Sequence, residues 1–142
     1  MEAKQLSVFI ENREGRLEDV LKVLEDNDIN ILSLSLAGTS EYGLLRLIVN
    51  NPKAGRDALQ SKGFSTRLTD VLVIRIEHKV GQLHELVYKL SQANINLEYM
   101  YGLNIENKLA SLVLKTSDID KARKILVANG VAIVTASDIE NM

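Results

Sequence analysis

The chain has 142 residues, of which 46% are hydrophobic and 25% are charged, and its formal net charge is −2. This balance is typical of a folded globular protein, and it argues against nucleic-acid binding, which requires a basic surface. The absence of cysteine excludes disulfides, thiolate metal sites and cysteine nucleophiles. No apolar run reaches the roughly 20 residues that span a bilayer, so we expect a soluble, cytoplasmic protein without a cofactor or a membrane contact.

An internal repeat dominates the sequence. Residues 10–31 read IENREGRLEDVLKVLEDNDINI, and residues 76–97 read IEHKVGQLHELVYKLSQANINL. Identical residues recur at one fixed spacing, which is the mark of a duplicated structural unit. The repeat predicts two small domains, residues 1–69 and 70–142, joined near Asp70 with almost no linker.

The first copy predicts strands at residues 5–10, 29–36, 44–49 and 64–68. Between the first two strands, apolar residues fall at the i, i+3, i+4 and i+7 spacing of an amphipathic helix, which ends near Asp28. A second helix begins with the capping residue Asn51 and Pro52 and is closed by Gly63.

The second copy predicts the same order, with strands at residues 71–77, 95–103, 109–116 and 131–135 and a last helix capped at residues 117–118. The two copies slip by one residue, which we assign to the exposed turn at residues 38–43. The order βαββαβ, occurring twice, is the α+β ferredoxin-like arrangement, in which both helices cover one face of an antiparallel sheet. Leu32, Leu34 and Leu36 suggest that the other face is apolar and is covered by a joined sheet or a second subunit.

The turn before each first helix is a candidate anion site, because the first amides of a helix have no intrahelical acceptors and carry partial positive charge. Gly15 and Gly81 allow close approach of the backbone, or a positive φ. Arg13 and Lys79 keep a positive charge in both turns. Residues of this kind are more often solvated surface charges, which is the simpler explanation of this pair.

The two copies resemble the ACT domain, a regulatory module that commonly binds free amino acids where two domains meet. The turn before Gly15, the leucine spacing of the helix and the ending at residues 28–31 carry the resemblance, and residues 81–97 repeat it. The resemblance implies a free-standing tandem protein that forms a homodimer, is not an enzyme and regulates a partner in trans. In the family's serine-binding members a turn of the form His-x-Asn-x-x-Gly precedes the helix. Here Ile10 and Ile76 stand where the motif has its His. Asn12 matches the Asn of the motif in the first copy, whereas His78 replaces that Asn in the second copy, so the two sites are expected to differ.

The ligand-binding residues that these arguments select lie in the two turns and at the start of the second strands. They are Asn12, Arg13, Glu14, Gly15, Arg16, Leu17, Asn30, His78, Lys79, Val80, Gly81, Gln82, Leu83, Asn96 and Tyr99. Tyr99 and Tyr101 share a strand face and either wall a pocket or cover the sheet. Asn30 and Asn96 either contact the ligand or bond their own turn backbone.

Three other functions are open to this sequence. It could be an assembly module whose ligand turns are unused. An acylphosphatase-like enzyme would use Arg13 and Asn30, but the turn ENREG has too few glycines for a phosphate cradle, and His78, His84 and Glu85 lack the i,i+4 spacing of a helical metal site. RNA binding would require stacking aromatic residues, which make up 4% of the chain. The sequence does not define which amino acid binds or which partner responds.

Overall fold

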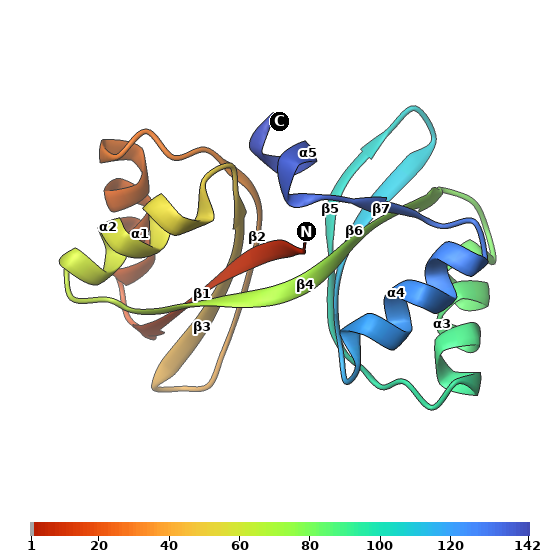
Figure 1. Ribbon diagram of the computed structural model, residues 1–142. Coiled ribbons are helices and arrows are strands. Elements are labelled where there is room, and N and C mark those ends of the chain that lie inside the picture. Colours follow the sequence, from red (N-terminus) through yellow and green to blue (C-terminus); the bar gives the residue numbers. More distant parts are fainter. Residues whose placement is uncertain (1) are drawn as a thin grey trace. The chain divides into compact units, whose positions relative to one another are not determined.

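The computed structural model describes residues 2–142, and each half of the chain forms a βαββαβ unit (Figure 1). The first half contains β1 (Ala3–Glu11), α1 (Arg16–Asp26), β2 (Ile31–Gly38), β3 (Tyr42–Val49), α2 (Pro52–Ser61) and the start of β4 (Ser65–Glu77). The second half contains the rest of β4, then α3 (Gln82–Gln92), β5 (Leu97–Glu106), β6 (Leu109–Thr116), α4 (Ile119–Ala128) and β7 (Ala132–Val134). A short helix, α5 (Ala136–Glu140), follows; it was not predicted.

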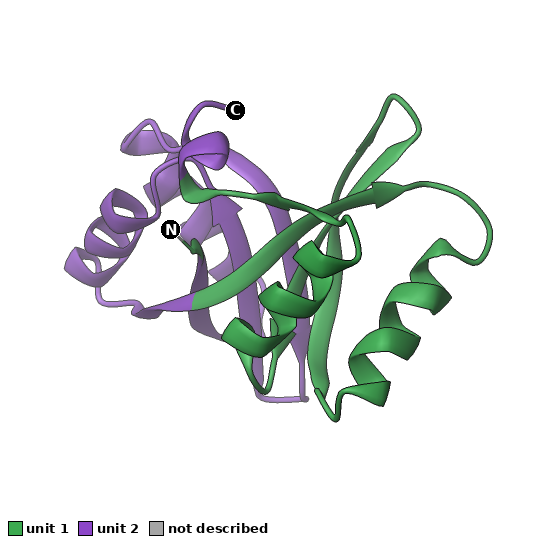
Figure 2. Ribbon diagram, turned by 45° about the vertical axis from the view of Figure 1, so that its right-hand side comes forward, with its two compact units in different colours: residues 1–3, 70–136 green, residues 4–69, 137–142 purple. Residues whose placement is uncertain are grey.

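The chain divides into two compact units (Figure 2). We call residues 4–69 with 137–142 the N-terminal unit, which is purple in Figure 2, and residues 70–136 with the first residues of the chain the C-terminal unit, which is green. These units differ from the predicted domain ranges in short terminal segments. The strand order is β2-β3-β1-β4 in the N-terminal unit and β5-β6-β4-β7 in the C-terminal unit. This is the predicted ferredoxin-like arrangement in both halves.

One continuous strand replaces two predicted ones. We expected separate strands at residues 64–68 and 71–77, but β4 runs unbroken for 13 residues. Its sequence, STRLTDVLVIRIE, contains neither glycine nor proline, the residues that most strongly interrupt a strand. The β-branched residues on both sides of Asp70 favour an extended chain throughout, so the predicted break is wrong.

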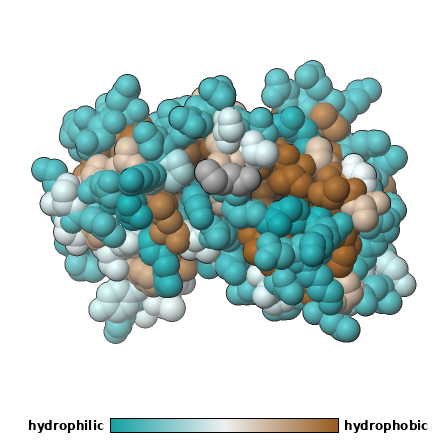
Figure 3. Space-filling model, viewed as in Figure 1, coloured by the Kyte–Doolittle hydropathy of each residue, from teal (hydrophilic) through white to brown (hydrophobic). Residues whose placement is uncertain are grey.

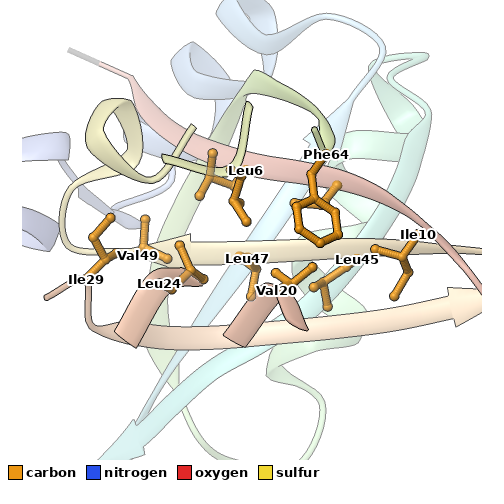
Figure 4. Packing of buried hydrophobic residues seen from close by; sticks show 11 residues of the cluster. Leu6, Ile10, Val20, Leu24, Ile29, Leu45, Leu47, Val49 and Phe64 are labelled. Atoms are coloured by element: carbon orange, nitrogen blue, oxygen red, sulfur yellow. The ribbon is translucent and has the colours of Figure 1, made fainter. Parts of the chain in front are cut away.

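The core of each unit lies between its sheet and its two helices. In the N-terminal unit, alternate side chains of β1 and β3 meet one stripe of α1, as the sticks in Figure 4 show. The buried residues labelled there are Leu6, Ile10, Val20, Leu24, Ile29, Leu45, Leu47, Val49 and Phe64. The C-terminal unit repeats this core with Leu72, Ile74, Leu86, Leu90, Ile95 and Leu114. Of the predicted helix stripes, Val20, Leu24, Leu86 and Leu90 are confirmed as core positions, and Leu17 and Val87 pack against the cores. Leu21 and Leu83 belong to neither core cluster, so their prediction as core positions is wrong.

The helix ends follow from local sequence. The side chain of Asn51 accepts a hydrogen bond from the Ala54 amide at 3.2 Å, and Asp118 accepts one from Lys121 at 3.1 Å. Helices α1 to α4 all close with the paired backbone bonds of the Schellman motif. In α1 the Ile29 amide bonds the Leu24 carbonyl oxygen at 2.9 Å, and Ile29 packs beside Leu24 in the core. This motif explains why both second strands begin two residues later than predicted.

The leucines of β2 do not mark the face opposite the helices, so that prediction is wrong. Leu34 pairs with Leu47 and Leu36 with Leu45, and partners directly opposite in an antiparallel ladder share a face. Since Leu45 and Leu47 are core residues, Leu34 and Leu36 lie on the helix side. The cause is a register shift after Ile31, because one extra residue inverts the alternation. The opposite face is nevertheless apolar and fully buried at Ile48, Val73 and Val113.

A two-residue turn joins β5 to β6. Asn107 and Lys108 have φ of 52° and 63°, which is the type I′ geometry that favours Asn-Gly. Lys108 therefore adopts a left-handed backbone conformation that is strained for lysine and unstrained for glycine.

We expect Lys108→Gly to raise the free energy of unfolding by about 1 kcal/mol, measured by chemical denaturation. Lys124→Gly is the matched control, because Lys124 is exposed in the interior of α4; it should lower stability by about 1 kcal/mol. Equal losses from both substitutions would contradict the strain at Lys108.

Candidate functional site

The two glycine turns have nearly the same backbone. Gly15 and Gly81 both have φ of 86° and immediately precede α1 and α3. A positive φ was one of the two roles predicted for these glycines, and the structure confirms it. No side chain caps either helix. The Arg16 amide donates to the Arg13 carbonyl oxygen at 3.4 Å and the Gln82 amide to the Lys79 carbonyl oxygen at 3.3 Å, so the amides that follow them in the first turn are left for solvent or a bound group.

The positive charges of the turns are held in exposed ion pairs. The Arg13 Nε lies 2.9 Å from a Glu11 carboxylate oxygen, and the Lys79 Nζ lies 3.0 Å from Glu77. All four side chains are more than half exposed, so each pair contributes little to stability. Each turn thus presents one cation and one anion side by side.

Asn12 and His78 occupy equivalent positions but bond differently. The amide of the Asn12 side chain donates to the Thr39 carbonyl oxygen at 2.7 Å, which fastens the glycine turn to the β2–β3 turn. The backbone amides of the two residues make equivalent bonds, Asn12 to the Glu41 carbonyl oxygen and His78 to the Lys108 carbonyl oxygen, each at 2.8 Å. Within the described residues, the His78 imidazole makes no hydrogen bond. The Asn12 amide therefore has a structural partner, whereas the His78 ring is available.

Arg16 also has a structural role. Its guanidinium lies 4.8 Å from the centre of the Phe64 ring and pairs with Asp19 at 3.0 Å. This stacked position holds the side chain over the core. The equivalent residue in the C-terminal unit is Gln82, so the two turns differ in charge here as well.

A hollow lies beside each glycine turn, within its own unit. The hollow of the C-terminal unit, which we call the C-hollow, has a volume of about 530 Å³. It is lined by Ile76, Glu77, His78, Lys79, Leu83, Gly102, Leu103, Asn104, Ile105, Ala110, Ser111 and Leu112. Its counterpart, the N-hollow, has a volume of about 240 Å³ and is lined by Ile10, Glu11, Asn12, Arg13, Leu17, Leu36, Gly38 and Gly43. Hydrophobic side chains reach the surface of the C-terminal unit among hydrophilic ones (Figure 3).

Strand pairing shows that the hollows are equivalent. Ile10 pairs with Gly43 as Ile76 pairs with Ala110. Gly43 also pairs with Gly38, whereas Ala110 pairs with Ile105. Between Gly102 and Asn104 the ladder of β5 shifts, so the one-residue slip between the copies lies in this bulge. Our assignment of the slip to the turn at residues 38–43 is therefore wrong.

The structure brings together some of the predicted site residues within a unit. Those that line the hollows are Asn12, Arg13, Leu17, His78, Lys79 and Leu83. Glu14, Gly15, Arg16, Val80, Gly81 and Gln82 belong to the same turns but do not line the hollows.

Asn30, Asn96 and Tyr99 lie elsewhere in their own units. Asn30 follows α1, whose 11 residues separate it by about 16 Å from the glycine turn. Its backbone amide and carbonyl bond Asn50, and those of Asn96 bond Ser117. Tyr99 pairs with Lys115, and Tyr101 pairs with Val113. The tyrosines share a face as predicted, but it is the face opposite the helices, away from the C-hollow.

Sequence reasoning missed the strand residues that shape the hollows. Gly102, Ile105 and Leu112 line the C-hollow, and Leu36 and Gly43 line the N-hollow. One signal was present, since an isolated glycine inside a strand often marks a bulge. Gly102 lies just before the bulge of β5.

Nothing in the described chain forms a metal centre: no group of three or more His, Asp or Glu residues is placed to hold an ion there. Arg13 and Asn30, which an acylphosphatase-like site would use together, lie at opposite ends of α1. None of the helices in the described range is long and apolar enough to cross a membrane.

Comparison with known proteins defines the family. A family model described as an ACT domain pair matches residues 1–142. The chain therefore belongs to the ACT domain pair family. ACT domains are regulatory, non-catalytic modules that bind small-molecule ligands and associate with the enzymes they regulate. No curated protein matches the chain.

Several solved structures are similar. The crystal structure of protein BT0572 from Bacteroides thetaiotaomicron is 36% identical, with a TM-score of 0.94, and the match covers 100% of this chain and 98% of that one. The regulatory subunits of aspartate kinase from Thermus flavus and Thermus thermophilus are 13% and 16% identical, with TM-scores of 0.66 and 0.65. Those matches cover 90% and 92% of this chain and the same shares of the subunits. At this identity they show a shared fold.

We expect Asn12→Ala to lower the free energy of unfolding by about 1 kcal/mol, because it removes the hydrogen bond to Thr39. His78→Ala, at the equivalent position, should change stability by less than about 0.5 kcal/mol. Urea denaturation of both variants measures the difference. Equal losses would show that the Asn12 bond has no special structural role.

Proposed function

We propose that this ACT domain pair is a non-catalytic sensor that binds free amino acids beside its glycine turns. The observation that carries the proposal is the hollow at each turn, built from equivalent residues in the two units. A volume of about 530 Å³ is within the usual range for small-molecule sites, which are mostly apolar and have a few polar groups. The C-hollow fits this description.

The rim of the C-hollow favours a zwitterion. Lys79 and Glu77 lie 3.0 Å apart and are both exposed, so they offer an ammonium and a carboxylate to the opposite charges of an α-amino acid. The uncapped start of α3 adds partial positive charge for the ligand carboxylate. The neighbouring His78 and Asn104 supply further hydrogen-bonding groups.

The regulatory mechanism follows from linkage. A ligand that binds one conformational or oligomeric state more tightly shifts the population toward that state. A regulated enzyme or regulator that recognises this state then responds without any chemistry in the ACT pair itself.

We also propose that the chain acts as a homodimer. Large apolar side chains are exposed on β2 and β5, with Leu34 46%, Leu36 48% and Ile105 63% exposed. These strands end the order of their sheets, and an edge strand is a ready surface for pairing with a second chain. Sedimentation velocity should show a dimer at micromolar concentration, and Leu34→Lys should shift it toward monomer. A wild-type monomer at all concentrations would contradict the proposal.

An assembly module with unused ligand turns is the alternative. It is favoured by the ion pairs and the Asn12 bond, which give the turn side chains partners inside the protein. If the protein is a sensor, a substitution in the glycine turn should weaken ligand binding. If it is an assembly module, the same substitution should leave partner binding unchanged.

Free amino acids should raise the melting temperature of the wild-type protein, because a ligand present at 100 times its Kd adds about 2.7 kcal/mol to stability. Gly81→Asp should weaken that binding at least tenfold relative to Gly81→Asn, since the added carboxylate repels the ligand carboxylate. The two variants share the backbone strain at φ of 86°, so their comparison isolates charge. Binding is measured by isothermal titration.

No binding of any standard amino acid to the wild-type protein would refute the sensor proposal and leave the assembly module. Equal affinity of the two Gly81 variants would show that the ligand carboxylate does not approach this turn.

A further inference from the structure

The two hollows differ in size, and one strand position in their walls carries a large residue in one unit and glycine in the other. Leu36 lies on the helix side of β2, opposite Leu45, and Gly102 lies on the helix side of β5, opposite Leu112. Both residues line their hollows. The unit with leucine at this position has the hollow of about 240 Å³, and the unit with glycine has the hollow of about 530 Å³.

The surroundings of Leu36 show that it occupies space in the N-hollow. A Cβ atom added to Gly43 would lie 3.3 Å from the Leu36 Cδ1 and 3.4 Å from the Ile10 Cγ1. Gly43 is therefore small enough to accommodate the leucine. In the C-terminal unit the equivalent of Gly43 is Ala110, and a Cβ atom added to Gly102 would meet no atom within 4 Å. The space that leucine fills in one unit is open in the other.

The bulge of β5 adds apolar wall to the open hollow. It places Ile105 opposite Ala110, on the helix side, where the N-terminal unit has Gly38 opposite Gly43. Leu103, at the bulge, also lines the C-hollow. The C-hollow therefore combines an apolar wall of Ile76, Leu83, Ile105 and Leu112 with the charged rim of Glu77 and Lys79.

We propose that Gly102 and Leu36 decide which unit is occupied and what it binds: the C-hollow takes one amino acid with a large apolar side chain, and Leu36 closes the N-hollow to such a ligand. This inference rests on the proposed amino-acid sensing. Burying an apolar ligand group gains free energy in proportion to the area removed from water, so an apolar wall discriminates by side-chain size. The charged rim is common to the two units and holds the backbone groups of the ligand.

The test titrates the full-length protein calorimetrically with L-leucine, L-isoleucine, L-methionine, L-phenylalanine, L-alanine and glycine. The wild-type protein should bind at least one of the four large apolar amino acids at one site per chain, and at least tenfold more tightly than glycine. Gly102→Leu should weaken that binding at least tenfold, because it fills the C-hollow. The open surroundings of Gly102 and its ordinary φ allow this substitution to fold, which circular dichroism verifies.

Three further variants complete the test. Glu106→Leu places the same side chain on an exposed position of β5 that does not line the C-hollow and should leave binding unchanged. Leu36→Gly should open the N-hollow and raise the stoichiometry to two sites per chain. Its control is Leu34→Gly, because Leu34 lies on the same strand face but outside the N-hollow. This control should leave the stoichiometry at one site per chain.

The possible failures are distinguishable. If no amino acid binds the wild-type protein, the proposed function itself fails. If amino acids bind but glycine binds as tightly as leucine, if two sites per chain are filled in the wild-type protein, or if Gly102→Leu binds normally, the sensing function stands and the assignment of Gly102 and Leu36 is overturned.

Discussion

The left-handed glycine between the first strand and first helix of each unit is the constraint on which the rest depends. With φ of 86° at Gly15 and Gly81, a conformation that costs an L-residue about 1–2 kcal/mol, the chain turns from strand to helix within a few residues. That turn places the uncapped helix start beside the middle of the sheet. It also directs the stripe of α1 or α3 onto the alternate side chains of the strands, which form the core of each unit. The backbone of the candidate site and the packing of the fold thus have the same origin.

The duplication keeps this architecture constant while side chains around it change. Both units retain the turn, the Schellman ending and the adjacent carboxylate–cation pair. They differ in side chains: the Asn12 side chain bonds the neighbouring turn and the His78 side chain does not, and Arg16 stacks on Phe64 where the C-terminal unit has Gln82. A pair of ACT domains can therefore share one fold and still have two unlike surfaces beside the glycine turns. The fold follows from the common features, and the differences distinguish one unit from the other.

Local signals in the sequence were sufficient for most of the fold. The stripe of Leu17, Val20 and Leu24, the caps at Asn51 and Asp118 and the glycine after α2 all depend on interactions within a few residues, and the structure confirms each. What failed depended on pairing between distant segments. The face of Leu34 and the bulge of β5 are set by the register of neighbouring strands, which one sequence does not reveal. The candidate site was predicted only in part for the same reason. Its turn residues are neighbours in the sequence, whereas Gly102, Ile105 and Leu36 are brought to it by strand pairing.

The bulge after Gly102 has a consequence for how such a repeat diverges. A strand alternates its side chains between two faces, so one inserted residue would exchange the faces of every residue beyond it unless a bulge absorbs the change. In β5 the bulge at Leu103 absorbs it, so that Ile105 still lies opposite Ala110 as Gly38 lies opposite Gly43. A single codon inserted into one copy of a duplicated gene can thus add a residue to the wall of a hollow, as Leu103 does here, while the pairing of the strand on both sides of it stays the same. Insertions near the end of an edge strand are in this sense a way to change the surface of one copy without disturbing its core.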